Sequence, residues 1–382
     1  MMIYLDNSAT TIPDTEVLET FTRANLEYYA NPASLHQAGN QAERLLESAR
    51  KQIAALAGDS EGTVIFTSGG TEANNLAIAG YARSLKHRGN HIITTEIEHD
   101  SVRNACLHLE TEGFEIDFLS VNEAGEVSPE ELRQKIRRET ILVSIVHVNN
   151  EIGTIQPIEA CSKVIRDHSR AIFHSDCVQS LGKISLPFPE WVDAVTLSAH
   201  KIHGLKGTGC LLTKKFKEPQ AISFGGGQES GYRSGTVNTP GAAAFAKAIR
   251  KVLEGNDVTK YQRWNRRLRK MMESEKLVRI CSPEEGSPHI FTIAFKGITG
   301  EVAVNYFQQR GVMVSTSSAC SSKANKVSHV IQAIHVPNDY RKGVIRISFG
   351  KMNIDDEIET LVQVIQEFLK TIKKGMKQHD ME

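Results

Sequence analysis

Lys201 is the residue of this sequence best placed for covalent chemistry with a carbonyl group. It lies in the segment SAHKIHGLKGTG, directly after the strand-like run DAVTLS, and Ser198 and His200 precede it. A lysine whose pKa is lowered by its surroundings can form a Schiff base with an aldehyde. A lone loop lysine is more often an exposed, hydrated side chain, so this prediction depends on other residues.

Asp176 is a second candidate, because it ends the strand-like run AIFHSD. The carboxyl ends of parallel strands meet at one edge of a sheet, so Asp176 and Lys201 are expected at the same edge. A buried carboxylate keeps a neighbouring ring nitrogen protonated, which a heteroaromatic electron sink requires. The alternative is a helix N-cap, the commoner role for an aspartate that follows a strand.

The segment FTSGGTEANN is a candidate phosphate site. Its strand ends near Thr67, and a helix is predicted to start near Thr71, with Gly69 and Gly70 between them. Glycines allow close approach of the backbone, and the N–H groups and dipole of a helix N-terminus favour an anion. Such turns also occur in α/β proteins without a phosphate ligand. Lysine, carboxylate and phosphate turn together suit pyridoxal 5'-phosphate.

Cys320 differs from the other five cysteines in its setting. No two of the six form a C-x-x-C pair, so the sequence predicts neither a zinc site nor a dithiol pair. Most free cysteines are buried small hydrophobes. The run VSTSSACSSKANK has no apolar periodicity, so we expect Cys320 in an exposed, mobile loop, as a nucleophile that visits two partners requires.

The elements that position these residues are predicted from alternation of short β-branched runs with helical stretches. Such alternation indicates a mostly parallel sheet covered by helices on both faces. The runs begin at Thr63, His91, Ile141, Ala171, Asp193 and Gly209. Two later runs begin at His289 and Gly343, and a final amphipathic helix has an apolar face formed by Ile354, Ile358, Leu361, Val362, Ile365 and Leu369.

Length and composition set outer limits on organisation and partners. A chain of 382 residues predicts one large and one smaller domain, here 16–255 for the large domain and 1–15 with 256–382 for the small one. Lys plus Arg and Asp plus Glu both total 45, so no global charge favours direct binding of nucleic acid or a membrane. Without a signal-like N-terminus or an apolar run of spanning length, we expect a cytoplasmic protein.

Nine motifs in fixed order resemble the cysteine desulfurases, the NifS and IscS family of fold-type I pyridoxal-phosphate enzymes within the class V aminotransferases. The resemblance covers essentially the whole chain, and its motifs are YLDNSATT, NPASLH, SGGTEANN, EHDSVRN, HVNNEIGT, HSDCVQSLGK, SAHKIHGLKG, GGGQESGYRSGT and SSACSS. It implies an α/β fold with a mostly parallel seven-stranded sheet flanked by helices, and a smaller α+β domain. The implied reaction removes sulfur from L-cysteine, gives L-alanine and leaves a persulfide on Cys320.

The resemblance also implies a role for each matching residue. Catalysis would fall to Lys201 as the Schiff-base lysine, His99 stacked on the cofactor ring and Cys320. Cofactor contacts would come from Gly70, Thr71, Asn150, Asp176, Gln179, Ser198, His200 and Thr236, with Thr236 reaching the phosphate of the neighbouring subunit of a homodimer. Arg346 would bind the substrate carboxylate, as a guanidinium fork does well, with Asn31 beside it. Taken singly, His99 and Arg346 have ordinary structural interpretations.

The resemblance leaves the sulfur acceptor and some rival functions open. The acceptor would be an iron–sulfur scaffold or a tRNA sulfurtransferase, and Cys320 could transiently ligate an iron–sulfur cluster, although no resident metal is expected. A selenocysteine lyase or another class V aminotransferase has the same fold, but aminotransfer needs no mobile cysteine. A non-catalytic sulfur-relay or scaffold protein would be expected to lose Lys201, Asp176 or His99, and this sequence keeps all three.

Overall fold

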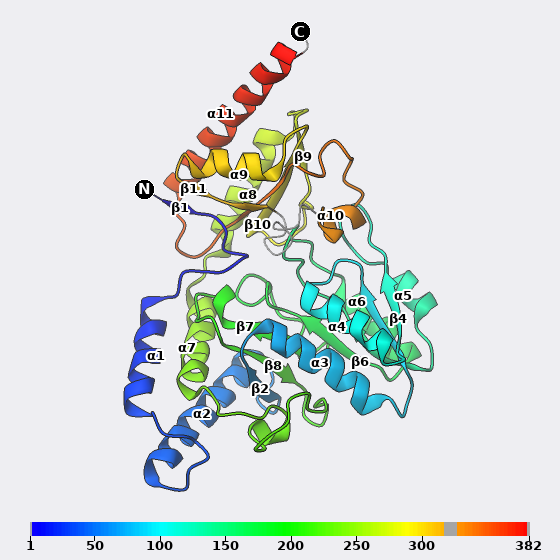
Figure 1. The fold of residues 1–382 in the computed structure, drawn as a ribbon, viewed down its shortest axis with the longest axis vertical. Coiled ribbons are helices and arrows are strands. Elements are labelled where there is room, and N and C mark those ends of the chain that lie inside the picture. The colour runs from blue at the N-terminus through cyan, green and yellow to red at the C-terminus, as the bar shows by residue number, and fades with distance from the viewer. Residues whose placement is uncertain (1, 317–326, 380–382) are drawn as a thin grey trace.

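A computed structural model describes residues 2–316 and 327–379, with side chains as far as residue 375. Over this part of the chain no helix combines the length and apolar character needed to cross a membrane. The chain forms one large sheet, a smaller four-stranded sheet and a two-stranded pair (Figure 1).

The seven-stranded sheet has the order β2-β8-β7-β6-β5-β3-β4, and only β8 runs antiparallel to its neighbours. This confirms the predicted mostly parallel seven-stranded sheet. Its strands are β2 (Thr63–Thr67), β3 (His91–Thr95), β4 (Glu115–Leu119), β5 (Thr140–Ser144), β6 (Ile172–Asp176), β7 (Ala194–Ser198) and β8 (Gly209–Thr213).

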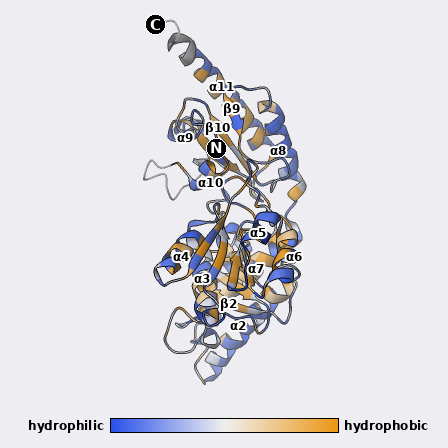
Figure 2. Ribbon diagram, turned by 90° about the vertical axis from the view of Figure 1, so that its right-hand side faces the viewer, coloured by the Kyte–Doolittle hydropathy of each residue, from blue (hydrophilic) through white to orange (hydrophobic). Residues whose placement is uncertain are grey.

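Helices cover both faces of this sheet, because alternate strand residues point to opposite sides and both sides are apolar. One core contains residues of α3 (Gly70–Leu85) and α4 (Asp100–Thr111). The core on the other face contains residues of α2 (Gln37–Leu56), α5 (Pro129–Lys135), α6 (Ile158–His168) and α7 (Thr239–Gly255). Figure 2 shows hydrophobic strands between helices with hydrophilic outer surfaces. Helix α1 (Thr15–Glu27) packs beside α7.

The four-stranded antiparallel sheet has the order β12-β13-β10-β9. A separate core joins the N-terminal residues Ile3 and Leu5 to residues between 261 and 372, which agrees with the predicted make-up of a small domain, although its boundaries remain a prediction. The elements of this part are β1 (Ile3–Tyr4), α8 (Val258–Met272), β9 (Val278–Ile280), β10 (Ile290–Phe295), α9 (Gly300–Gln308), β11 (Val312–Met313), β12 (Ser315–Thr316), α10 (His329–Ala333), β13 (Val344–Ser348) and α11 (Asp355–His379).

Helix α11 confirms most of the predicted apolar face. Ile358, Leu361 and Ile365 are buried in the small core, as are Val362 and Leu369. Ile354 was expected on the same face, but it precedes the helix and is 56% exposed. The helical period therefore holds only from the first helical turn onward.

Candidate active site

A cavity of about 330 Å³ lies at the carboxyl edge of the seven-stranded sheet, where Arg346 of β13 also reaches it. It collects residues from both sheets and from the N-terminal segment. Of the predicted site residues, it is lined by Gly70, Thr71, His99, Asn150, Asp176, Gln179, Ser198, His200, Lys201 and Arg346. Residues as far apart in the sequence as Ser8 and Arg346 thus share one enclosure, and the residues at its sheet edge meet there as expected for the carboxyl ends of parallel strands.

Lys201 ends the short 3₁₀ turn η1 (Ala199–Lys201), which follows β7 directly. Its Nζ donates hydrogen bonds to the carbonyl oxygens of Ser8, at 2.5 Å, and Ala9, at 2.8 Å. The carbonyl of Lys201 accepts a hydrogen bond of 2.9 Å from Nζ of Lys183. Burial and the neighbouring charge of Lys201 lower the pKa of Lys183 to about 7. Main-chain carbonyl groups of the N-terminal segment therefore help to position the Lys201 amine.

Asp176 is the last residue of β6 and is 5% exposed. Its Oδ1 accepts from the N–H of Val178 at 3.0 Å, and its Oδ2 accepts from Nδ2 of Asn74 at 2.7 Å. The first bond resembles the local capping interaction considered from the sequence. The second comes from α3 and directs the carboxylate within the cavity that Asp176 lines. The carboxylate is thus fixed in orientation, as a partner for a protonated ring nitrogen would be.

His99 is linked to Asp176 through two other side chains. Nδ2 of Asn74 also donates to Oγ of Ser101 at 2.8 Å, and that oxygen lies 2.8 Å from Nδ1 of His99. The N–H of Ser101 donates to the same Nδ1 at 3.2 Å. Because Nδ1 accepts a main-chain N–H, the neutral imidazole carries its proton on Nε2. Ser101, at the start of α4, thus fixes both the orientation and the tautomer of the His99 ring.

The turn between β2 and α3 has the features of an anion cradle. Gly69 has a φ of 152°, which favours glycine, and α3 begins at Gly70. A Cβ on Gly70 would lie 3.0 Å from Cγ2 of Val178, so a side chain there would crowd the cavity wall. The buried Oγ of Ser198 has no hydrogen-bond partner among the described residues. A phosphate group would supply that partner and receive the helix N–H groups.

His200 lies beside this cradle as a neutral side chain. Burial and the nearby charges of Lys201, Lys206 and Lys183 lower the pKa of His200 to about 4. Its Nδ1 lies 3.1 Å from Oγ1 of Thr10. The N-terminal segment therefore orients both His200 and Lys201.

Three hydrogen bonds hold the guanidinium group of Arg346 and leave part of its donor capacity unused. Its Nη2 donates to Oδ1 of Asp6 at 2.9 Å and to Oγ of Ser315 at 3.0 Å, and its Nη1 donates to the carbonyl of Asn150 at 2.9 Å. Only 3% of the side chain is exposed. The buried Nε has no partner among the described residues, and a substrate carboxylate would satisfy it.

Glu98 is a cavity residue that the sequence did not single out. Its Oε1 accepts from Oγ1 of Thr95 at 2.9 Å and from the N–H of Val146 at 2.8 Å, whereas the buried Oε2 has no partner among the described residues. Burial raises the pKa of Glu98 to about 8, so the side chain is mostly a neutral acid at pH 7. The only sequence signal for it is its place next to His99.

Other residues missed from the sequence act through long-range contacts. Asn74 bonds Asp176, Asp6 bonds Arg346, and Nε2 of His329 lies 2.9 Å from the carbonyl oxygen of Glu98. His329 also lines the cavity. Burying an arginine or aspartate without a partner costs free energy. That cost is the general reason to expect partners for Arg346 and Asp176.

Three predicted site residues are not in the described cavity. Asn31 and Thr236 are exposed, Asn31 in the connection between α1 and α2 and Thr236 in the connection between η2 (Glu229–Gly231) and α7. The structure therefore does not bring Asn31 beside Arg346 within one chain, and both assignments remain predictions. Cys320 lies outside the described residues. Within the described ranges, no group of three or more His, Cys, Asp or Glu residues could hold a metal ion.

Comparison with known proteins shows relatives over nearly the full length. The family model described as aminotransferase class-V matches residues 3–361. A protein of Archaeoglobus fulgidus named cysteine desulfurase IscS 1 is 37% identical, over 95% of this chain and 96% of its own. A solved structure entitled NifS-like protein has a TM-score of 0.88 and 34% identity, with 97% of this chain and all of that chain covered. Another, entitled SspA in complex with cysteine, has a TM-score of 0.81 and 30% identity, with 92% and 100% covered.

The family match spans every described strand, from β1 to β13. The matches agree with the motifs read from the sequence and with the cavity that those motifs form. The chain belongs to the pyridoxal-phosphate-dependent class V aminotransferase family, among its NifS- and IscS-like cysteine desulfurases.

Proposed function

We propose that this chain is a cysteine desulfurase that uses pyridoxal 5'-phosphate to convert L-cysteine to L-alanine and retains the sulfur as a persulfide on Cys320. The observation that carries the proposal is the convergence of Lys201, Asp176, His99 and Arg346 on one cavity. The relatives' names support the activity, and the neighbour solved with cysteine supports the substrate.

The cavity offers a matching group for each part of the cofactor. Lys201 would hold the aldehyde carbon, Asp176 would keep the ring nitrogen protonated, and His99 would pack on the ring. The phosphate would lie between Thr71, Ser198 and His200 at the start of α3, and Asn150 and Gln179 would line the phenolate side. When bound, the cofactor supplies an electron sink that acidifies the Cα–H of an amino acid.

The protein's own groups then bind substrate and move protons. Arg346 would receive the substrate carboxylate through its unsatisfied Nε. The amine of Lys201 would take the proton from Cα of the bound substrate. His99, whose neutral ring carries its proton on Nε2, would carry a proton between the substrate thiol and Cys320.

The sulfur step requires that the thiolate of Cys320 attack the substrate sulfur. The new S–S bond forms as the C–S bond breaks, and the electron pair of that bond passes to the carbon skeleton, which protonation converts to alanine. Described residues on either side of Cys320 in the sequence lie at the cavity. Ser315 accepts a hydrogen bond from Arg346, and His329 lines the cavity wall.

We further propose a homodimer in the cytoplasm. The exposed positions of Thr236 and Asn31 suit residues that complete the site of the partner subunit. The persulfide would pass to an acceptor protein, an iron–sulfur scaffold or a tRNA sulfurtransferase. Light scattering of the purified enzyme tests whether it is a dimer. A lower cofactor affinity of Thr236→Ala than of the wild type would support a contribution of Thr236 to the partner subunit's cofactor site.

The proposed activity is tested by measuring alanine and sulfide formed from L-cysteine in the presence of a reductant. Wild-type enzyme should form both in equal amounts, whereas Cys320→Ser should form neither above background while keeping its bound cofactor. Sulfide release by Cys320→Ser at the wild-type rate would refute the role of Cys320. Faster turnover of L-selenocysteine that survives the Cys320→Ser substitution would instead identify a selenocysteine lyase.

A further inference from the structure

A second pocket, of about 430 Å³, lies at the opposite edge of the seven-stranded sheet from the cavity described above. Its walls come from segments that precede strands: Arg88 comes before β3, Arg170 before β6 and Asp193 before β7. Lys217 follows β8, which runs antiparallel and therefore ends at this same edge. None of the residues that line this pocket lines the first cavity.

The pocket has a marked excess of positive charge. Among the described residues that line it, the cations are Arg88, Arg166, Arg170 and Lys217, and the only carboxylate is Asp193. That carboxylate is already engaged: its Oδ2 accepts from the N–H of Phe173 at 3.0 Å, and its Oδ1 lies 3.6 Å from Nζ of Lys214. Asp193 therefore does not neutralise the four cations that surround the pocket.

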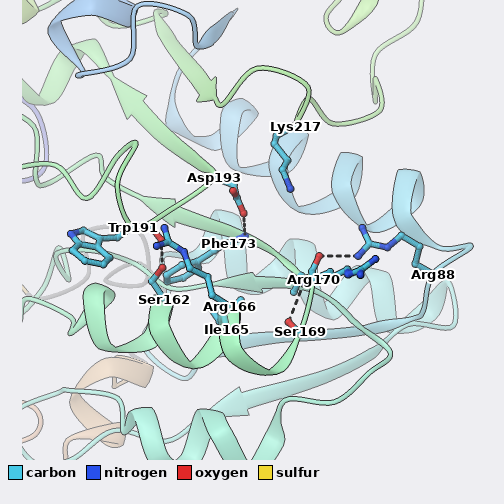
Figure 3. A pocket seen from close by; sticks show the side chains of 11 residues that line it. Arg88, Ser162, Ile165, Arg166, Ser169, Arg170, Phe173, Trp191, Asp193 and Lys217 are labelled. Carbon is cyan, nitrogen blue, oxygen red and sulfur yellow. Dashed lines mark hydrogen bonds between the residues drawn. The ribbon is translucent and has the colours of Figure 1, made fainter.

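Main-chain carbonyls position two of the arginines without cancelling their charge. Nη2 of Arg88 donates to the carbonyl of Arg170 at 2.9 Å, and Nη2 of Arg166 donates to the carbonyl of Glu190. Figure 3 shows Arg88 beside Arg170 on one side of the pocket and Arg166 beside Trp191 on the other. Arg166 also lies over the ring of Trp191, 5.7 Å from its centroid, and the guanidinium groups of Arg88 and Arg166 retain further N–H donors.

Ordinary structural roles account for part of this arrangement only. Arg166 is in the last turn of α6, where a cation also favours the helix dipole. Arg170 directly follows Ser169, the C-cap of α6, so it also lies near that helix end, whereas Lys217 lies in a connecting segment after β8. A multiply charged anion would offset the excess of positive charge among the residues that line the pocket.

The shape of the pocket favours a ligand larger than a simple ion. Its volume falls within the range usual for small-molecule sites, and buried Ile165 and Phe173, with Trp191, form an apolar wall beside the cations. Arginine forks match phosphate oxygens in pairs of hydrogen bonds. From this geometry we propose that the pocket binds a small phosphorylated ligand, with its phosphate groups among Arg88, Arg170 and Lys217.

Calorimetric titration of the cofactor-loaded enzyme with inorganic pyrophosphate tests this site, because the bound cofactor already occupies the other phosphate cradle. We expect saturable binding at physiological ionic strength, weakened at least tenfold in the double variant Arg170→Ala/Lys217→Ala. The matched control, Lys51→Ala/Arg138→Ala, removes two exposed cations outside the pocket and should bind as the wild type does.

Three results would overturn the proposal. They are the absence of saturable binding, equal binding by the two double variants, and tighter binding of citrate than of pyrophosphate. Alanine formation from L-cysteine is measured on the same samples. If the wild-type enzyme forms no alanine, the proposed function is refuted, whereas the binding of pyrophosphate still tests the second pocket independently.

Discussion

At the carboxyl edge of the central sheet, Arg346 is buried, paired with Asp6 and shielded by the small domain's strands. At the amino edge, Arg88, Arg166 and Arg170 are exposed, and Arg88 and Arg166 donate to main-chain carbonyls in place of a carboxylate. The first arrangement suits tight orientation of one substrate in a site of low dielectric, and the second suits capture of an anion from solution. One sheet thus presents two differently built anion sites.

The largest expected effect comes from Lys201→Ala at the carboxyl edge. Loss of the amine removes both the attachment point of the cofactor and the proposed base, so alanine formation should fall at least about 1000-fold. The visible absorbance of the bound cofactor should change at the same time. Lys51→Ala, an exposed lysine on α2, is the control and should keep both signals.

Arg346→Ala should have the next largest effect. Losing charge-assisted hydrogen bonds to a carboxylate costs roughly 2 to 3 kcal/mol, or about a 30- to 150-fold loss in kcat/KM for L-cysteine. Arg346→Lys keeps the positive charge but loses the forked guanidinium group, so its kcat/KM should lie between the values of the wild type and of Arg346→Ala. Unchanged steady-state kinetics of Arg346→Ala would show that Arg346 does not bind the substrate carboxylate, and would contradict the contrast between the two edges.

Glu98→Gln should change the pH dependence of stability. Burial raises the pKa of Glu98 from 4.5 to about 8, so between these values the folded protein holds a proton that the unfolded chain has released. Stability from this group is complete below about pH 4.5 and is lost as the pH rises through about 8, by at most about 1.4 kcal/mol per pH unit. Melting temperatures from pH 5 to 9 should show the variant gaining on the wild type as pH rises.

The exposed neighbour Glu96 offers the matched control for that measurement. Glu96→Gln should melt in parallel with the wild type across the range. A constant difference between Glu98→Gln and the wild type at every pH would mean that Glu98 is ionised in the folded state.

The smallest effect is expected at the amino edge. Arg170→Ala/Lys217→Ala removes two exposed cations, so the free energy of unfolding should change by less than about 1 kcal/mol. Turnover of L-cysteine should stay within about twofold of the wild type. A large loss of turnover would show that the two edges are coupled and that the amino-edge pocket serves the reaction.

The sequence located the strands that carry the cavity, because Asp176, Ser198 and Lys201 follow β-branched runs whose order is visible in the chain. It did not predict β4, an edge strand whose residues Glu115 to Phe118 are at least partly exposed and so carry a weak apolar pattern. Motif resemblance, more than periodicity, placed His99 and Arg346.

The supporting residues were beyond prediction because their partners are distant in the chain. Asp6 and Arg346 are separated by 340 positions, and Asn74 and Asp176 by 102. No local pattern records such a pair. The positive charge of the second pocket was not predicted for the same reason. Arg88, Arg166 and Lys217 are far apart in the sequence, and only the folded sheet places them at one pocket.

Locating the sulfur after one turnover tests the desulfurase account most directly. Enzyme loaded with its cofactor would be mixed with sulfur-labelled L-cysteine, without a reductant, and digested for peptide mass spectrometry. We predict labelled sulfur on the peptide that contains Cys320, in a ratio to alanine near one, and none on that peptide from Lys201→Ala. Alanine formation with the label on another cysteine, or with no label on the protein, would contradict the account.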